Sequence, residues 1–213
     1  MANEKIKQPT MTSFVKDLPN ICSLAGLLCA LMGIYFAIGG NYPLAIIGLL
    51  WAIFFDWSDG IIARRIKNRT DESRLFGAQM DSLIDVVSFG VLPSILLLSY
   101  SHFNLWFLPG AFIILAGCVI RLSYFNIFGL NDDSSYTGMA VDNNGIIIAF
   151  LFIFEPFIGH SVFSIILYSA CIIVAVLNIA SIKTPKLTGK WFYVLIAYVL
   201  ILTTIFCRTL YLQ

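Results

Sequence analysis

Long apolar segments recur from residue 20 to the C-terminus, and they restrict the possible fold more than any other feature of the chain. About twenty apolar residues cross a bilayer as a helix, because only a helix pairs every backbone polar group within one segment. Hydrophobic residues make up 59% of the 213 residues, and charged residues make up 12%. The sequence therefore predicts an all-α, polytopic membrane protein with spans near residues 20–38, 43–65, 77–100, 105–126, 143–158, 162–181 and 189–208.

These segments predict one membrane domain and no separate soluble domain. We expect a six-helix transmembrane core followed by an additional, seventh C-terminal transmembrane helix. The predicted boundaries are 1–17 for a cytoplasmic N-terminal segment, 18–190 for the membrane domain and 191–213 for the additional helix. The first sixteen residues lack the apolar core and cleavage site of a signal peptide, so we expect no segment to be removed. Residues 9–16 weakly match a short amphipathic helix lying along the membrane interface.

Lysine and arginine residues are distributed unevenly between the two sides of the predicted bundle. If the N-terminus is cytoplasmic, that side carries twelve of the thirteen basic residues, and the opposite side carries Arg208. Cytoplasmic loops of membrane proteins carry an excess of Lys and Arg. The sequence therefore predicts a multi-pass protein of the cell membrane whose N-terminus is cytoplasmic.

Four aspartates lie inside two of the predicted spans. Asp56 and Asp59 belong to the second span, and Asp81 and Asp85 belong to the third. Because an Asp at the centre of a span costs about 2.5–3.5 kcal/mol, these side chains must face one another or a polar cavity. Spacings of three and four residues place each pair on one helix face. The polar loop 67–73 is short, so we expect antiparallel helices that bring the four carboxylates into one cytoplasmic pocket.

A pocket of four carboxylates predicts a site for divalent cations. So many acids in a small volume cannot all stay ionised unless cations lie among them or some are protonated. Oxygen ligands suit Mg²⁺, Mn²⁺ or Ca²⁺, and two such ions roughly 4 Å apart would bind a diphosphate and stabilise phosphoryl transfer. Two alternatives remain open: helix-end aspartates paired with Arg64, Arg65 or Arg74, and the ion pathway of a cation transporter.

The segment from Asp56 to Asp85 resembles the signature of the CDP-alcohol phosphotransferase family, also called the CDP-alcohol phosphatidyltransferase family. All eight fixed positions of that signature are present within thirty residues, namely Asp56, Asp59, Gly60, Ala63, Arg64, Gly77, Asp81 and Asp85. The resemblance implies a membrane enzyme that uses two divalent cations. It also implies substrates of two kinds, a CDP-lipid from the bilayer and a small alcohol.

The resemblance further implies a role for each residue of the signature. The metal ligands would be Asp56, Asp59, Asp81 and Asp85. Asp85 would in addition be the catalytic base that takes the proton from the acceptor hydroxyl. Gly60 and Ala63 would admit the cytidine of the CDP-lipid, and Arg64 would lie near its diphosphate.

Longer stretches are similar to the membrane-embedded phosphatidylserine synthases within that family. The similarity includes residues 77–93, 18–20 and 121–126, and it extends over residues 18–190. It implies transfer of a phosphatidyl group from CDP-diacylglycerol to L-serine with release of CMP. Sister enzymes with the same chemistry use choline, ethanolamine, inositol or glycerol 3-phosphate, so these acceptors remain alternatives. The resemblance also favours a homodimer, and we expect no nucleic-acid partner.

One region departs from the phosphatidylserine synthases. After Gly138-Met139 they usually continue with prolines, whereas this chain continues Ala-Val-Asp142-Asn-Asn. The acceptor is expected to enter here, and Asp142 would pair with an amine or a quaternary ammonium; alternatively, it begins the fifth helix as a cap. Arg121 suits the carboxylate of serine or a phosphate, or else it is a helix-end Arg that extends to the interface.

Overall fold

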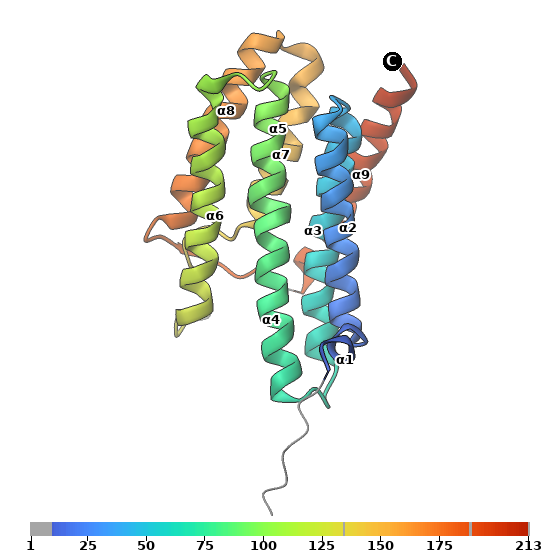
Figure 1. Cartoon of the computed structure of the whole chain (residues 1–213), viewed down its shortest axis with the longest axis vertical. Coiled ribbons are helices and arrows are strands. Elements are labelled where there is room, and N and C mark those ends of the chain that lie inside the picture. Colours follow the sequence, from blue (N-terminus) through green and yellow to red (C-terminus); the bar gives the residue numbers. More distant parts are fainter. Residues whose placement is uncertain (1–9, 134, 188, 213) are drawn as a thin grey trace, which may run out of the picture.

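The structure is a computed structural model that describes residues 10–133, 135–187 and 189–212. Its long helices run side by side along one axis (Figure 1). Residues 1–9, which carry two of the lysines used for the predicted orientation, lie outside the described residues.

The elements follow one another as helices joined by short turns, except for two brief strands in loops. In chain order they are α1 Met11–Val15, α2 Leu18–Ile38, α3 Tyr42–Arg65, α4 Asp71–Asp85, η1 Val86–Val91, α5 Leu92–Tyr100, η2 Leu105–Phe107, α6 Leu108–Phe128, β1 Tyr136–Thr137, α7 Asp142–Leu151, η3 Phe152–Phe157, α8 His160–Ile179, β2 Lys183–Thr184 and α9 Lys190–Leu212. The short α1 lies within the stretch for which an interfacial helix was predicted.

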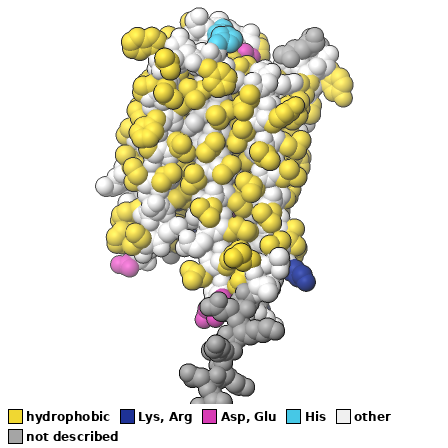
Figure 2. All heavy atoms as spheres, in the orientation of Figure 1, with side chains coloured by type: hydrophobic (Ala, Val, Ile, Leu, Met, Phe, Trp, Pro, Cys, Tyr) yellow, Lys and Arg dark blue, Asp and Glu magenta, His cyan; other side chains and the backbone are white. Residues whose placement is uncertain are grey.

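Among the described residues, six helices are long and apolar enough to cross a membrane. They are Leu18–Ile38, Tyr42–Arg65, Asp71–Tyr100, Leu105–Phe128, His160–Ile179 and Lys190–Tyr211. The predicted span at 143–158 is found as ten α-helical residues of α7 followed by six residues of 3-10 helix in η3, which contains Pro156. Hydrophobic side chains cover the flanks of the bundle in Figure 2, and charged side chains gather at its ends. The predicted all-α, polytopic membrane architecture is confirmed.

Helices α2 and α3 form the tightest pair of the bundle. Their connection turns at Gly39 and Gly40, and the side chain of Asn41 then caps α3 by accepting a hydrogen bond from the Leu44 amide at 3.2 Å. A Cβ atom on Gly48 would lie 2.8 Å from Cα of Gly33. Small residues at such positions let the backbones of membrane helices approach closely, and this contact fixes the helix that carries Asp56 against α2.

The helix Asp71–Tyr100 is continuous, but it changes its winding just after the second pair of aspartates. Residues Val86–Val91 form a π-helical turn, a feature that is frequent at functional sites. Pro93 has no N–H to bond the carbonyl of Phe89 four residues earlier. Instead, the buried side chain of Asn144 in α7 donates to Phe89 O at 3.2 Å. This bond ties the start of α7 to the helix that carries Asp81 and Asp85.

Two loops on the aspartate side of the bundle pair with each other. The α6–α7 loop and the α8–α9 loop form a two-stranded antiparallel sheet in which Tyr136 faces Thr184 and Thr137 faces Lys183. The Thr184 hydroxyl also donates to Gly138 O at 2.6 Å. Together these loops cross the bundle between its two ends (Figure 1), and residues from both of them line the cavity described next.

Candidate active site

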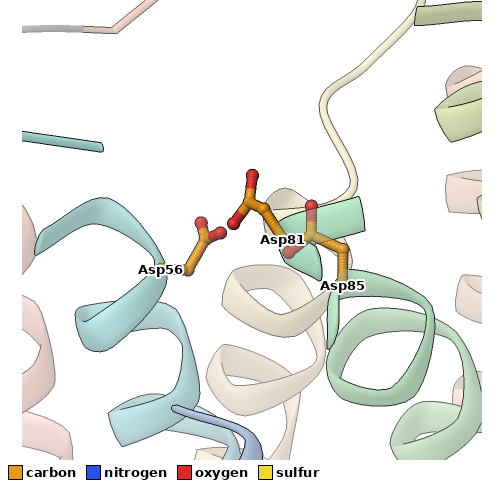
Figure 3. Close-up of side chains that lie close together, drawn as sticks. All are labelled: Asp56, Asp81 and Asp85. Carbon is orange, nitrogen blue, oxygen red and sulfur yellow. The ribbon is translucent and has the colours of Figure 1, made fainter. Parts of the chain in front are cut away.

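Three of the four aspartates come together between α3 and α4. Asp56 lies on α3, Asp81 and Asp85 lie on α4, and one carboxylate oxygen from each lies within 4.8 Å of the others. Figure 3 shows the side chains of the two helices turned toward one another. The spacing of the acids along antiparallel helices predicts this convergence, and the structure contains it.

Asp59 lies one turn beyond Asp56 on α3 and has a partner of its own. Its side chain is 7% exposed and accepts a hydrogen bond from the hydroxyl of Ser23 on α2. Asp59 is thus outside the group of mutually close carboxylates, although it lines the same cavity. Ser23 is a neighbour that the sequence did not indicate.

The aspartates border a cavity of about 300 Å³ that is open at one side. Most of the residues predicted for the site line it, namely Asp56, Asp59, Gly60, Arg64, Asp81, Asp85, Arg121 and Asp142. Ala63 follows Gly60 by three residues, and it is not part of this lining. The structure therefore gathers the predicted metal, nucleotide and acceptor residues around one space, with Ala63 as the exception.

The two glycines of the signature have different surroundings. A Cβ atom on Gly60 would have Arg64 Nη1 as its neighbour at 3.5 Å, which is an ordinary contact. A Cβ atom on Gly77 would lie 2.8 Å from Arg69 Nη2 and 3.0 Å from Asn20 Oδ1. Gly77 therefore permits close packing of protein atoms, whereas Gly60 leaves free space on the cavity wall.

Arg121 is buried at the cavity rather than extended to the interface. Its side chain is 6% exposed, and its guanidinium carbon lies 5.0 Å from the ring centres of both Phe125 and Tyr136. Within the described part of the chain, its Nε atom has no hydrogen-bond partner. A buried donor without a partner is uncommon in proteins, so Arg121 retains hydrogen-bonding capacity that the described residues do not use.

Asp142 is the first residue of α7, and its carboxylate contacts α3. The indole Nε1 of Trp57 donates a hydrogen bond to Asp142 Oδ2 at 2.7 Å. The N-cap position itself belongs to Val141, which makes no side-chain capping bond. Trp57 lies between Asp56 and Asp59 in the chain, and the sequence offered no sign that its indole would reach residue 142.

Lys186 adds a further cation to the cavity wall. It lies in the α8–α9 loop, with its Nζ atom 5.9 Å from the ring centre of Tyr136. Burial, and then the nearby Arg64, lower the pKa of Lys186. Burial, and then Asp142, raise the pKa of Tyr136. Both residues reach the site through the pairing of the two loops, which hydropathy along the chain does not reveal.

The described residues contain two ion pairs, and both lie outside the aspartate group. Arg69 pairs with Asp17 at 2.7 Å, and Lys183 pairs with Asp133 at 2.7 Å. Among the described residues, the intramembrane aspartates therefore form no ion pair with Arg64, Arg65 or Arg74, and the alternative of paired helix-end acids is wrong. Three carboxylates this close repel one another when ionised, and their oxygens are the ligands that Mg²⁺, Mn²⁺ and Ca²⁺ prefer. The donor set thus fits divalent cations.

Comparisons with known proteins identify a family and several relatives of this chain. A family model described as CDP-alcohol phosphatidyltransferase matches residues 16–177. The chain is 33% identical to the archaetidylserine synthase of Methanothermobacter thermautotrophicus over 193 residues, which cover 89% of this chain and 76% of that protein. It is 30% identical to the CDP-diacylglycerol–serine O-phosphatidyltransferase of Methanocaldococcus jannaschii over 72% of this chain and 70% of that protein. A protein of the same name from Helicobacter pylori is 27% identical over 90% of this chain and 82% of that protein.

Proposed function

The chain belongs to the CDP-alcohol phosphatidyltransferase family, and on this basis we propose that it transfers a phosphatidyl group from CDP-diacylglycerol to L-serine. The products are phosphatidylserine and CMP. One observation carries the proposal: Asp56, Asp81 and Asp85 place their oxygens within 4.8 Å of one another, beside a cavity that also holds Arg64 and Arg121. Phosphoryl transfer requires acidic side chains that bind metal ions and basic side chains that bind the anionic groups of the substrate.

Divalent cations, when bound, would offset the charge of the carboxylates and stabilise the charge that develops on the diphosphate. The residues that would hold them are Asp56, Asp59, Asp81 and Asp85. The acceptor hydroxyl loses its proton to Asp85 as its oxygen bonds to the lipid-side phosphorus. The bond from that phosphorus to the bridging oxygen breaks, and CMP leaves with the electron pair. Arg64, an exposed residue of the cavity lining, would offset negative charge on the diphosphate.

The acceptor portion of the cavity is proposed to lie between Arg121 and Asp142. The guanidinium of Arg121 suits the carboxylate of serine, and the carboxylate of Asp142 suits its ammonium group. Ethanolamine and choline carry a cationic group without a carboxylate, whereas inositol carries neither. An arrangement with one residue of each charge therefore favours serine over these acceptors.

We place the active site on the cytoplasmic side of the cell membrane. Helix α1 and the α3–α4 loop lie at one end of the bundle, opposite the C-terminus of α9, and the loops that line the cavity cross the bundle between its two ends (Figure 1). The basic residues of these segments are in excess over those at the other end, where Arg208 lies near the C-terminus of α9. This distribution follows the positive-inside rule, and it gives serine and CMP direct access to the cytoplasm.

The direct test is CMP release by the purified protein from CDP-diacylglycerol with Mn²⁺ or Mg²⁺. Serine, ethanolamine, choline, inositol and glycerol 3-phosphate are tested in parallel. We expect release that depends on serine and is abolished by EDTA. Release with another alcohol alone would keep the chemistry and reject serine as the acceptor. Cation flux in sealed vesicles, without CMP release under any condition, would support a transporter instead.

Gly60→Ala is expected to weaken CDP-lipid binding without harming the fold. The added methyl group would enter the cavity, where its closest protein neighbour is Arg64 Nη1 at 3.5 Å. We expect the KM for CDP-diacylglycerol to rise about tenfold, which corresponds to a loss of about 1.4 kcal/mol. The melting temperature should stay the same or rise, because Ala is about 1 kcal/mol better than Gly inside a helix.

The matched control for this variant is Ser58→Ala, on the same helix. Ser58 bonds to the carbonyl of Phe54 at 2.6 Å and does not line the cavity, so its KM for CDP-diacylglycerol should stay unchanged. An unaltered KM in the Gly60 variant would contradict the proposed place of the nucleotide.

A further inference from the structure

Trp57 makes a contact that the metal-dependent chemistry does not explain. It lies on α3 between two of the aspartates, and its indole Nε1 donates to Asp142 Oδ2 at 2.7 Å across 85 positions of sequence. An indole has one hydrogen-bond donor, and this bond uses it. The helix that carries Asp56 is thereby joined to the first turn of α7.

Trp57 donates to one oxygen of the Asp142 carboxylate, which also accepts from the backbone N–H groups of residues 142 and 143. The nearest side-chain donor to Oδ1 is Asn143 Nδ2 at 3.5 Å, which is at the limit for a hydrogen bond. A carboxylate accepts through both oxygens, so Oδ1 can still receive a donor. Neither ion pair of the described residues includes Asp142, and it lines the cavity.

Arg121 supplies the opposite charge in the same cavity. Its guanidinium is held between Phe125 and Tyr136 at 5.0 Å from each ring centre. Although the side chain is 6% exposed, its Nε atom has no partner among the described residues. Arg121 and Asp142 form no ion pair with each other. Two opposite charges therefore line one cavity without neutralising each other through direct contact.

We propose that Trp57 is a positioning residue that fixes Asp142 as the receptor for the ammonium group of an amino-acid acceptor whose carboxylate binds Arg121. The inference rests on the proposed function and specifies its acceptor as a zwitterion. The bond from the indole restricts the rotation of the Asp142 side chain, so that Oδ1 faces the acceptor when it arrives. Because Trp57 lies between two proposed metal ligands in the chain, the same bond sets the acceptor site relative to the aspartates.

The test is Trp57→Phe, which removes the N–H and keeps an aromatic ring. We expect the KM for serine to rise about tenfold, as for a lost hydrogen bond to a charged group. The kcat and the KM for CDP-diacylglycerol should remain within about twofold of wild type. The substitution removes only the bond to Asp142 and no contact with the phosphoryl group or with the proposed metal ligands. Asp142→Asn should raise the KM for serine at least as much.

Two partial acceptors separate positioning from a general loosening of the site. Ethanolamine has the ammonium group without the carboxylate, and 3-hydroxypropionate has the carboxylate without the ammonium group. Each is titrated against the incorporation of labelled serine. In the Trp57 variant, the ethanolamine concentration for half-inhibition should rise several-fold relative to wild type, whereas that for 3-hydroxypropionate should not change.

Trp51→Phe is the matched control on the same helix. Trp51 packs against Phe54 and Phe55 and does not line the cavity, so its variant should behave as wild type in every assay. Equal weakening of both partial acceptors by Trp57→Phe, or no change in the KM for serine, would overturn the positioning role. A wild-type protein that releases CMP without responding to serine would contradict the proposed function itself, and with it this inference.

Discussion

Asp85→Asn is expected to lower the rate of CMP release about 10³-fold while CDP-diacylglycerol still binds. Asn has nearly the shape of Asp, but it cannot take the proton from the acceptor hydroxyl, and loss of a general base typically costs about 10²–10⁴ in rate. Asp56 and Asp81 remain to hold a cation near the diphosphate, so binding of the lipid should survive. Single-turnover CMP release and equilibrium binding of a labelled CDP-lipid measure the two effects separately.

Asp71→Asn is the matched control for this experiment. Asp71 begins the same helix as Asp85, and it is exposed and outside the cavity lining. Its variant should retain the wild-type rate. If Asp85→Asn kept more than a tenth of the wild-type rate, the proton acceptor would have to be another residue, and the proposed role of Asp85 would be wrong.

Removal of divalent cations is expected to abolish activity and to lower thermal stability. A ligand present at a hundred times its Kd stabilises the native state by about 2.7 kcal/mol, which corresponds to a shift of about 5–10 °C for a chain of this size. We therefore expect the protein in detergent to melt higher with Mn²⁺ than with EDTA. Differential scanning fluorimetry with and without the metal provides the measurement.

Asp56→Asn should reduce that shift, because it removes one of the three carboxylates that lie within 4.8 Å of one another. In EDTA the same variant should melt no lower than wild type, since repulsion among the acids is relieved. Asp132→Asn, at an exposed position outside the cavity lining, should keep the full metal-dependent shift. A full shift in the Asp56 variant would mean that the cation binds elsewhere.

The aspartate group could be predicted because it depends on local geometry. Two residues three or four apart on a helix face the same way, and a short loop makes consecutive helices neighbours. Acids in a membrane span must also avoid the lipid. Together with the two rules, this requirement predicts that Asp56 lies near Asp81 and Asp85. They did not reveal that Asp59 would be held by Ser23, because that contact depends on how α2 packs against α3.

The acceptor side of the cavity depends on contacts between distant parts of the chain. The bond from Trp57 to Asp142 spans 85 positions, and the bond from Asn144 to Phe89 spans 55. The pairing of Tyr136 with Thr184 brings together two loops that α7, η3 and α8 separate in the chain. Periodicity and hydropathy describe single segments, so neither could predict these contacts.

The sequence by itself determined the membrane-spanning helices, since a lipid environment forces backbone groups to pair within each apolar segment. It also determined which helix faces carry the acids, because the helical repeat is a property of the backbone. Only the tertiary structure decided that the segment after residue 142 is a short helix ending in η3, that residues of the two paired loops line the cavity, and that Trp57 bonds to Asp142. Those features arise from side chains that meet only after the helices have packed, where the shape and hydrogen bonding of each neighbour select one arrangement.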